Sequence, residues 1–382
     1  MLTTDLTTLR REFHAIAEVS GKEYHTAKKV VEVLQTLNPT EVISPIGGTG
    51  VIAVFDSFQE GPTILFRCEL DALPIQEINT FAHRSITEGV SHKCGHDGHL
   101  TSMLGLAKQL SQTPPKKGKV LLVFQPAEEN GEGAKAILED DKFDTLSPDY
   151  VFAFHNLPGY PLNKIIYKPA SFTASVKSII IKLHGKTAHA AEPEHGDNPA
   201  LALSRILQES LKLANNNPDD EKLTVITPIH INMGELAYGI SAGYGELHLT
   251  VRTWTEDYLE HISDQIVALS KKIASEENLT PEIAFTQHFQ ANENHPEAME
   301  HLLSAIKECD LPAAERAYPF KWGEDFGLFT QKYKGAMFGI GSGENCPALH
   351  NPDYDYPDEI TPVAVRLFHQ IALRIAEVYQ TA

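Results

Sequence analysis

Positive charge is scarce in this 382-residue sequence. Lys and Arg total 32 against 51 Asp and Glu, the net charge is −19, and no predicted helix carries a run of basic residues. Nucleic acids and anionic membrane surfaces both attract proteins through clustered positive charge. We therefore expect no nucleic acid and no membrane among the partners of this protein.

Long apolar runs and frequent cysteines are also missing. No run reaches the roughly 18 apolar residues of a membrane span, and the N-terminal segment MLTTDLTTLRREFHAIAE lacks the apolar core of a signal peptide. The four Cys are scattered, unlike the disulfide framework of a small secreted domain. We expect a cytoplasmic protein. Its length and its 42% of apolar residues favour two globular domains.

Short apolar runs alternate with helical segments through much of the chain. They are VIAVF (51–55), TILF (63–66), VLLVF (120–124), YVFAF (150–154) and AMFGI (336–340). Such runs between helices are typical of an α/β fold with a mainly parallel sheet covered on both faces. Because active sites of these sheets lie beyond the carboxyl ends of the strands, we expect the polar segments that follow the runs to converge.

The pattern changes between residues 175 and 289. Strands and helices there are predicted in the order βαββαβ, which is the ferredoxin-like arrangement. We infer that this segment is an inserted second domain. The first domain is then discontinuous and comprises residues 1–174 and 290–382.

The segment HKCGHDGH (92–99) concentrates metal-ligand chemistry. Cys94 and His96 flank Gly95, so both side chains can reach one ion or a close pair of ions. A thiolate with imidazoles and a carboxylate suits Zn, Mn, Co or Ni better than Mg or Ca. A structural zinc site and a redox thiol are the alternatives, but the first needs four closed ligands at short spacing and the second a resolving Cys nearby.

Other candidate ligands and acids follow the predicted strands. Glu128 and Glu129 are adjacent and point in different directions, so one can bind a metal while the other faces the substrate, although a solvated helix start would also fit. Asp71 can orient a ligating imidazole, bridge to the metal or merely cap a turn. His155 and His350 each sit just past an apolar run in a Pro-bounded turn, where a lone His is more often structural.

Seven segments carry a resemblance that covers nearly the whole chain. In order they are RCELDALP, HKCGHDGH, VFQPAEENGEGA, FHNLP, GKTAHAA, GEDF and LHNP. Together they resemble the metal-dependent amidohydrolase branch of the aminoacylase and carboxypeptidase family, which includes hippurate hydrolases, N-acetyl-diaminopimelate deacetylases and indole-acetyl-amino-acid hydrolases. The resemblance implies a di-metal catalytic domain, and an inserted ferredoxin-like lid through which two subunits form a homodimer.

The resemblance also implies roles for individual residues. The implied metal ligands are Cys94, His96, Glu129, His155 and His350, with Cys94 shared between two divalent ions. Glu128 matches the general base that takes a proton from a metal-activated water and delivers one to the leaving amine. Mn or Zn are the expected metals, with Co and Ni as alternatives.

Two residues of the inserted domain match the family as well. His189 in GKTAHAA matches a lid histidine that in relatives reaches the partner subunit's active site and helps to hold the oxyanion. Arg252 in TVRTW matches a lid arginine that clamps the substrate's carboxylate. A surface His in a loop and an exposed strand Arg are the alternatives. Relatives often have Asn where this chain has Gly239, and usually Asp where it has Glu69, so Gly239 is a candidate determinant of the substrate.

These features predict a two-metal hydrolase of small N-acyl amino acids, such as N-acetyl or N-benzoyl compounds. A dipeptidase or carboxypeptidase on the same scaffold is the alternative within hydrolases, although CGHDGH resembles the acyl-amino-acid branch more closely. A non-catalytic metal- or amino-acid-binding protein is a further alternative. It would not need a base, whereas Glu128 stands beside the whole ligand set.

Overall fold

The computed structural model describes residues 5–379, and the chain divides into two compact units. Unit 1 comprises the described residues up to Phe172, then Asn292–Ala317, and the chain from Glu324 onward. Unit 2 comprises Thr173–Ala291 and the short segment Tyr318–Gly323. Among residues 5–379, no helix combines the length and the apolar composition needed to cross a membrane.

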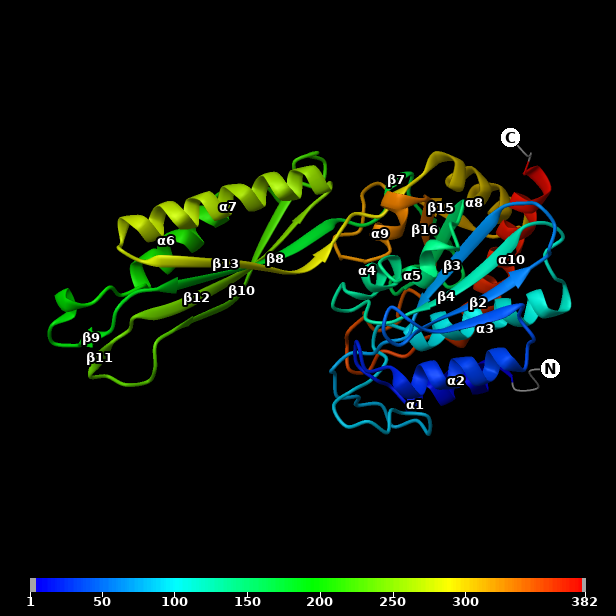
Figure 1. Ribbon diagram of the computed structural model, residues 1–382, viewed down its shortest axis with the longest axis horizontal. Coiled ribbons are helices and arrows are strands. Elements are labelled where there is room, and N and C mark those ends of the chain that lie inside the picture. Colours follow the sequence, from blue (N-terminus) through cyan, green and yellow to red (C-terminus); the bar gives the residue numbers. More distant parts are fainter. Residues whose placement is uncertain (1–4, 380–382) are drawn as a thin grey trace. The chain divides into compact units, whose positions relative to one another are not determined.

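Unit 1 contains a large sheet with helices on both faces (Figure 1). Its helices are α1 (Leu6–Ala15), α2 (Tyr24–Gln35), α3 (His96–Gln112), α4 (Gly133–Leu138), α5 (Asp141–Asp144), α8 (Pro296–Glu308), α9 (Gly327–Lys332) and α10 (Thr361–Val378). Its strands are β1 (Glu41–Ile46), β2 (Gly50–Asp56), β3 (Thr63–Glu69), β4 (Lys119–Gln125), β5 (Tyr150–Leu157), β6 (Ile165–Tyr167), β7 (Ala170–Ser171), β14 (Glu293–Asn294), β15 (Ala313–Glu315) and β16 (Lys334–Gly341).

The large sheet has eight strands in the order β1-β2-β4-β3-β5-β16-β6-β15. Its four central strands, β4, β3, β5 and β16, are parallel to their neighbours within this group. Strands β1 and β2 add an antiparallel edge, and β6 is antiparallel to β16. The prediction of a mainly parallel sheet is thus confirmed. The predicted apolar runs form β2, β3, β4, β5 and β16.

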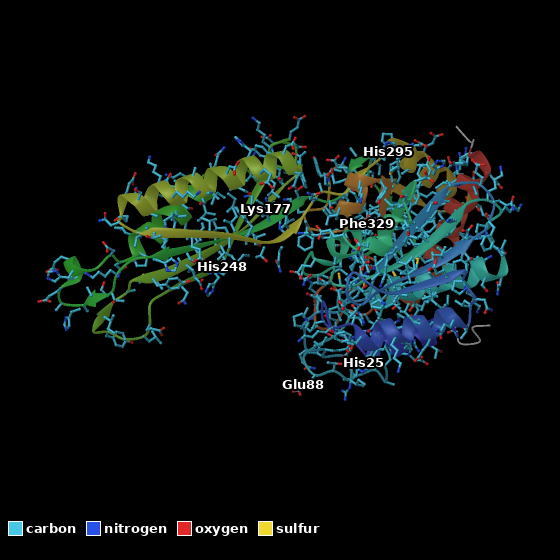
Figure 2. The ribbon with its side chains drawn as sticks, viewed as in Figure 1. His25, Glu88, Lys177, His248, His295 and Phe329 are labelled. Carbon is cyan, nitrogen blue, oxygen red and sulfur yellow. The ribbon has the colours of Figure 1, made fainter. Side chains whose placement is uncertain are left out.

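The apolar runs form strands because both faces of the sheet are buried. Phe66 on β3 and Phe152 on β5 stack within a core that includes side chains of α1, α2, α3, α8 and α10. Alternate residues such as Leu65 and Val151 are equally buried and point to the other face, because successive side chains of a strand alternate. Phe143 of α5 and Phe329 of α9 make an edge-to-face ring contact, and Phe329 is labelled in Figure 2.

Unit 2 has the predicted ferredoxin-like order, coloured green to yellow in Figure 1. Its elements are β8 (Ser175–His184), β9 (Ala188–His189), α6 (Ala200–Leu211), β10 (Thr224–Met233), β11 (Ile240–Ser241), β12 (Tyr244–Thr253), α7 (Glu256–Glu276) and β13 (Thr280–Phe289). The four long strands form an antiparallel sheet in the order β10-β12-β8-β13. Leu247 and Leu249 of β12 share a core with Ile206 of α6 and Ile266 of α7. The helices therefore pack on the apolar face of this sheet.

Candidate metal centre

Several separate segments of unit 1 supply the candidate ligands. Cys94 precedes Gly95, the N-cap of α3, and His96 is the first residue of that helix. Gly95 between them has φ 93°, a left-handed conformation that favours glycine. A Cβ at this position would also lie 2.8 Å from the Asn156 side chain, so the turn and its packing both need glycine.

The remaining ligands come from segments associated with β4, β5 and β16. Glu128 and Glu129 follow β4, and His350 lies in the loop after β16. His155 lies inside β5, which continues to Leu157, so the prediction that it follows the strand in a turn is wrong. Pairing with β16 continues the extended backbone beyond the apolar run, from His155 to Leu157, whereas pairing with β3 ends at Ala153.

Two overlapping groups of three potential ligands share Cys94. One group joins Cys94 to His96 and His155, and the other joins it to Glu129 and His350. Within each group the ligand atoms lie within 4.8 Å of one another. Cys94 Sγ is 3.4 Å from His155 Nε2, and His350 Nε2 is 3.8 Å from Glu129 Oε2. This arrangement has the geometry of two neighbouring sites joined by a thiolate.

Hydrogen bonds at Nδ1 orient two of the imidazoles. His96 Nδ1 donates to the main-chain oxygen of Asp71 at 2.9 Å, and His155 Nδ1 donates to that of Asn156 at 2.8 Å. A ring that carries its proton on Nδ1 presents a lone pair at Nε2, and this is how partners of a ligating His set its tautomer. His155 Nε2 lies 3.4 Å from Cys94 Sγ, and His96 Nε2 lies 3.9 Å from Glu129 Oε1.

Buried polar atoms without partners show that this cluster suits a cation. His96 Nε2 and Glu129 Oε1 are buried and have no hydrogen-bond partner among the described residues. Such atoms cost free energy unless a ligand satisfies them. The donors are a sulfur, imidazole nitrogens and carboxylate oxygens, which is a set typical of Zn and similar divalent metals. The residues therefore fit a divalent metal.

The electrostatics of the cluster favour added positive charge. Burial, reinforced by the charges of Glu324, Glu129 and Asp325, raises the pKa of Glu128 well above its ordinary value. Burial together with the charges of Glu129 and Glu128 raises the pKa of the Cys94 thiol. Both shifts mean that anionic groups are crowded in a medium of low polarity. A divalent cation would relieve this crowding.

Glu128 lies at the edge of the ligand set. Its Oε2 is 3.8 Å from His96 Nε2, and the side chain is buried. Asp71 lies on the opposite side of the same imidazole, with Oδ1 3.2 Å from His96 Nδ1. Asp71 Oδ2 also accepts the Glu129 main-chain N–H at 3.0 Å and the Ser20 hydroxyl at 2.7 Å. Asp71 thus holds two candidate ligands at once.

A buried ionic cluster behind the ligands was not predicted from the sequence. Arg67 is fully buried and contacts Glu69, Glu324 at 2.8 Å and Asp325 at 2.6 Å. Glu69 Oε2 also accepts a hydrogen bond from His99 Nδ1 at 2.7 Å, so the longer side chain finds two buried partners. Two features of the sequence could have indicated this cluster. The GEDF segment contains Glu324 and Asp325, and Arg67 is a charged residue that follows the apolar run TILF, two positions before Glu69.

The three candidate residues of the inserted domain all lie in unit 2. His189 on β9 is exposed, and its Nδ1 accepts the Ala191 N–H at 3.1 Å. Gly239 lies beside it, because its main-chain oxygen accepts the Ala190 N–H at 3.0 Å. Arg252 on β12 donates from Nη1 to the main-chain oxygen of Lys321 at 2.8 Å. His189 and Gly239 are therefore neighbours, and the roles of all three residues stay predictions.

Comparison with known proteins decides the family. Residues 65–374 match peptidase family M20/M25/M40. The chain belongs to this family. The M20 chain is 31% identical over 368 residues to a hippurate hydrolase of Campylobacter jejuni, which covers 96% of this chain and 95% of that protein. It is 30% identical over 349 residues to an N-acetyldiaminopimelate deacetylase of Streptococcus uberis, with 91% and 92% covered.

A solved structure agrees with this assignment. A dinuclear metal-binding peptidase of the M20 family from Bacillus subtilis superimposes with a TM-score of 0.82 and 27% identity, over 98% of both chains. The resemblance read from the seven motifs is confirmed. This M20 protein is a metal-dependent amidohydrolase.

Proposed function

We propose that this M20 amidohydrolase cleaves the amide bond of N-acyl amino acids, with an N-acetyl, N-benzoyl or similar acyl group, using two divalent metal ions. The observation that carries the proposal is the pair of ligand groups that share Cys94, with Glu128 beside them. The names of the two relatives denote hydrolysis of acylated amino groups. Mn and Zn are the metals that we expect, with Co and Ni as alternatives.

The residues of unit 1 would divide the chemistry between them. Bound divalent ions supply Lewis-acid activation of water and of the amide carbonyl. Glu128 would take a proton from the attacking water and deliver a proton to the leaving amine. Cys94, His96, Glu129, His155 and His350 would hold the ions. Asp71 would keep His96 in its Nδ1-protonated tautomer and hold the Glu129 backbone.

We further propose that a second copy of the chain pairs with unit 2. Strand β10 is an edge of its sheet, and it exposes Ile229, Ile231 and Met233 by 60%, 55% and 40%. An exposed apolar edge strand favours association. In the homodimer His189 would help to hold the oxyanion in the partner's site, and Arg252 would bind the substrate's carboxylate. Four free cysteines agree with a cytoplasmic location.

The hydrolase proposal is tested by amine release from a substrate panel. The panel contains N-acetyl, N-benzoyl and N-indoleacetyl amino acids with a few dipeptides, and the purified protein is first loaded with Mn or Zn. We expect turnover of at least one acyl series, with loss of turnover after chelation. Turnover of dipeptides alone would overturn the proposed substrate class, and no turnover by the metal-loaded protein would overturn the proposed activity on these substrates.

A further inference from the structure

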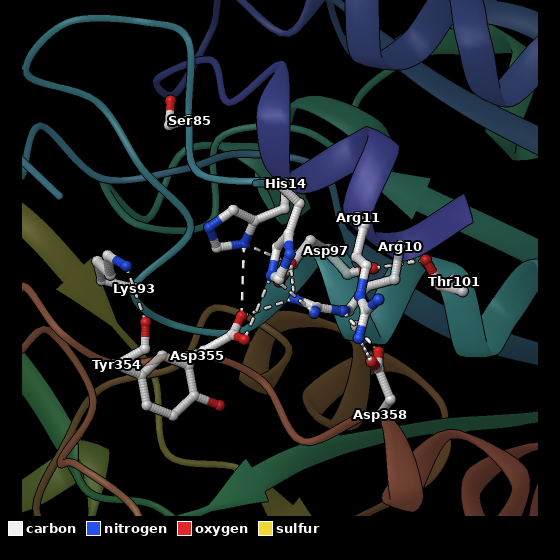
Figure 3. A network of polar contacts seen from close by, with 12 residues as sticks. Arg10, Arg11, His14, Ser85, Lys93, Asp97, Thr101, Tyr354, Asp355 and Asp358 are labelled. Carbon is white, nitrogen blue, oxygen red and sulfur yellow. Dashed lines mark hydrogen bonds and ion pairs between the residues drawn. The ribbon is translucent and has the colours of Figure 1, made fainter. Parts of the chain in front are cut away.

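Lys93 directly precedes Cys94 and is completely buried. Its Nζ donates to the main-chain oxygen of Tyr354 at 2.8 Å, as Figure 3 shows. It also donates to Glu77 Oε1 at 2.6 Å. A buried ammonium group is costly unless it is paired and hydrogen-bonded. The two contacts satisfy the charge of the ammonium group. The contact with Tyr354 also ties the segment of Cys94 to the chain after His350.

The main chain of Lys93 makes a second connection to the same loop. Its carbonyl oxygen accepts the N–H of His350 at 2.8 Å. Lys93 therefore holds the loop at His350 through its backbone, and at Tyr354 through its side chain. Tyr354 is itself buried, and its hydroxyl hydrogen-bonds to Asn156, the neighbour of His155.

His350 depends on this loop more than the other candidate ligands depend on theirs. Its side chain is 53% exposed, whereas that of Glu129 is 12% exposed and that of His96 is 1% exposed. Its φ of 66° lies in the left-handed region, which a non-glycine residue keeps only where its surroundings hold it. His96 and His155 are oriented by other groups, the carbonyls of Asp71 and Asn156.

The hydrogen-bond network of Lys93 continues through Glu77 to helix α1. Glu77 also interacts with His14 Nε2 at 3.1 Å and accepts the Ser85 N–H at 2.7 Å. His14 Nδ1 in turn donates to Asp97 at 2.8 Å, as Figure 3 shows around His14 and Asp97. Glu77 is therefore held on several sides and gives Lys93 a fixed counter-charge. The lysine is thus a rigid link between two ligand-bearing segments.

We propose that Lys93 is a positioning residue that sets the metal affinity of the ligand group Cys94, Glu129 and His350. The inference rests on the proposed two-metal function. Removing Nζ would free the Tyr354 carbonyl and leave only the main-chain bond of Lys93 to hold the loop at His350, while the group of Cys94, His96 and His155 keeps its own orienting hydrogen bonds. Loss of Lys93 therefore weakens one of the two sites.

Metal titration of Lys93→Met tests this. We expect the wild-type protein to bind two Mn or Zn ions in equilibrium dialysis with elemental analysis. In Lys93→Met one affinity falls about 10- to 100-fold, the range for loss of a group that supports a ligand, and the other stays unchanged. His350→Ala should weaken the same ion. High metal concentration should restore kcat in Lys93→Met with KM unchanged.

Three further variants distinguish a specific loss of metal affinity from a loss caused by a less stable fold. Glu77→Gln removes the counter-charge of Lys93 but keeps its link to Tyr354, so it should lower the same affinity less than Lys93→Met does. Lys93→Met/Glu77→Gln removes the link without leaving Glu77 as an unpaired buried charge, so it should lose the same affinity even where Lys93→Met alone folds poorly. Lys177→Met removes a buried lysine of unit 2, labelled in Figure 2, which pairs with Glu260, and it should change neither affinity.

The outcomes separate this inference from the proposed function. A wild-type protein that binds fewer than two ions would refute the two-metal proposal itself. Two ions in the wild-type protein with both affinities unchanged, or both lowered equally, in Lys93→Met/Glu77→Gln would overturn the role of Lys93 alone.

Discussion

The main-chain oxygen of Asp71 accepts a hydrogen bond from Nδ1 of His96 at 2.9 Å, and the Asp71 carboxylate lies 3.2 Å from the same nitrogen. This imidazole therefore carries a proton on the nitrogen that faces Asp71. The same carboxylate accepts the Glu129 N–H. One aspartate thus orients a nitrogen ligand and an oxygen ligand.

Asp71→Asn should lower metal affinity about 10- to 100-fold, because loss of a carboxylate that supports a ligating His typically has this effect. Isothermal titration with Zn measures it. Ser20→Ala removes only the hydroxyl that donates to Asp71 and serves as the matched control, with a smaller loss expected. Equal losses in the two variants would contradict the role given to the carboxylate.

Glu128→Gln should retain both metal ions but lose about 10²- to 10⁴-fold in kcat, because an amide cannot accept the proton of the attacking water. Elemental analysis and amine release are measured on the same preparation. Cys94→Ala is the comparison, and should lose metal and activity together. Near-normal turnover by Glu128→Gln would show that another group is the base.

A mixture of the His189→Ala and Glu128→Gln proteins tests whether each active site combines residues of both subunits. In a homodimer whose sites combine residues of both subunits, one of the two sites in each mixed dimer is whole. Random mixing then restores about a quarter of wild-type activity, since about half of the dimers are mixed and each has one intact site. No recovery, although differently tagged subunits of the two variants co-purify as mixed dimers, would contradict the contribution of His189 across subunits.

Ile231→Lys should convert the protein to a monomer, because it places a charge on the exposed apolar edge strand β10. Size-exclusion chromatography with light scattering gives the mass. Phe58→Lys is the matched control, since Phe58 is 79% exposed in unit 1 and should leave the dimer intact. A dimeric Ile231→Lys protein would place the interface elsewhere.

Glu77 should contribute stability that disappears in acid. Burial alone would raise its pKa, but hydrogen bonds from His14, Lys93 and the Ser85 N–H lower the pKa to about 2. A carboxylate with a lowered folded pKa stabilises fully above its ordinary value of 4.5, and this contribution is lost as the pH falls toward 2. Urea unfolding across this range should show a shallower decline for Glu77→Gln. An unchanged slope would mean that the network does not hold the carboxylate.

Gly95→Ala tests the close packing of the turn before α3, and Gly48→Ala, in the turn between β1 and β2, is its matched control. Both glycines have left-handed φ, 93° and 99°, but a Cβ at Gly48 would meet nothing within 4 Å. Gly48→Ala should therefore cost only backbone strain, about 1–2 kcal/mol. Gly95→Ala should cost about 1–3 kcal/mol more through overpacking against Asn156, and should also lower metal affinity. Equal free energies of unfolding for the two variants would contradict the close contact.

Much of the fold could be predicted from local pattern. Runs such as VLLVF became central strands because five consecutive apolar residues can be buried only where both faces of a sheet are covered. Apolar and polar residues alternate along β12, and apolar residues recur at helical spacing along α7. Patterns of this kind allowed the βαββαβ order to be predicted. The short strands β6 and β15, which are the last two in the sheet order, lack such a pattern and were missed. The segment Tyr318–Gly323 also joins unit 2 through long-range contacts such as that of Arg252 with Lys321.

The sequence by itself determined which side chains can ligate a metal at this sheet edge, since Cys94, His96 and the Glu128–Glu129 pair sit at fixed local spacing. Only the tertiary structure decided what holds them. Arg67 meets Asp325 across 258 positions, and Lys93 meets Tyr354 across 261. Local periodicity reports which face of an element is buried. A buried charge, however, must find its partner wherever the packed chain brings one, and that partner is set by the whole fold.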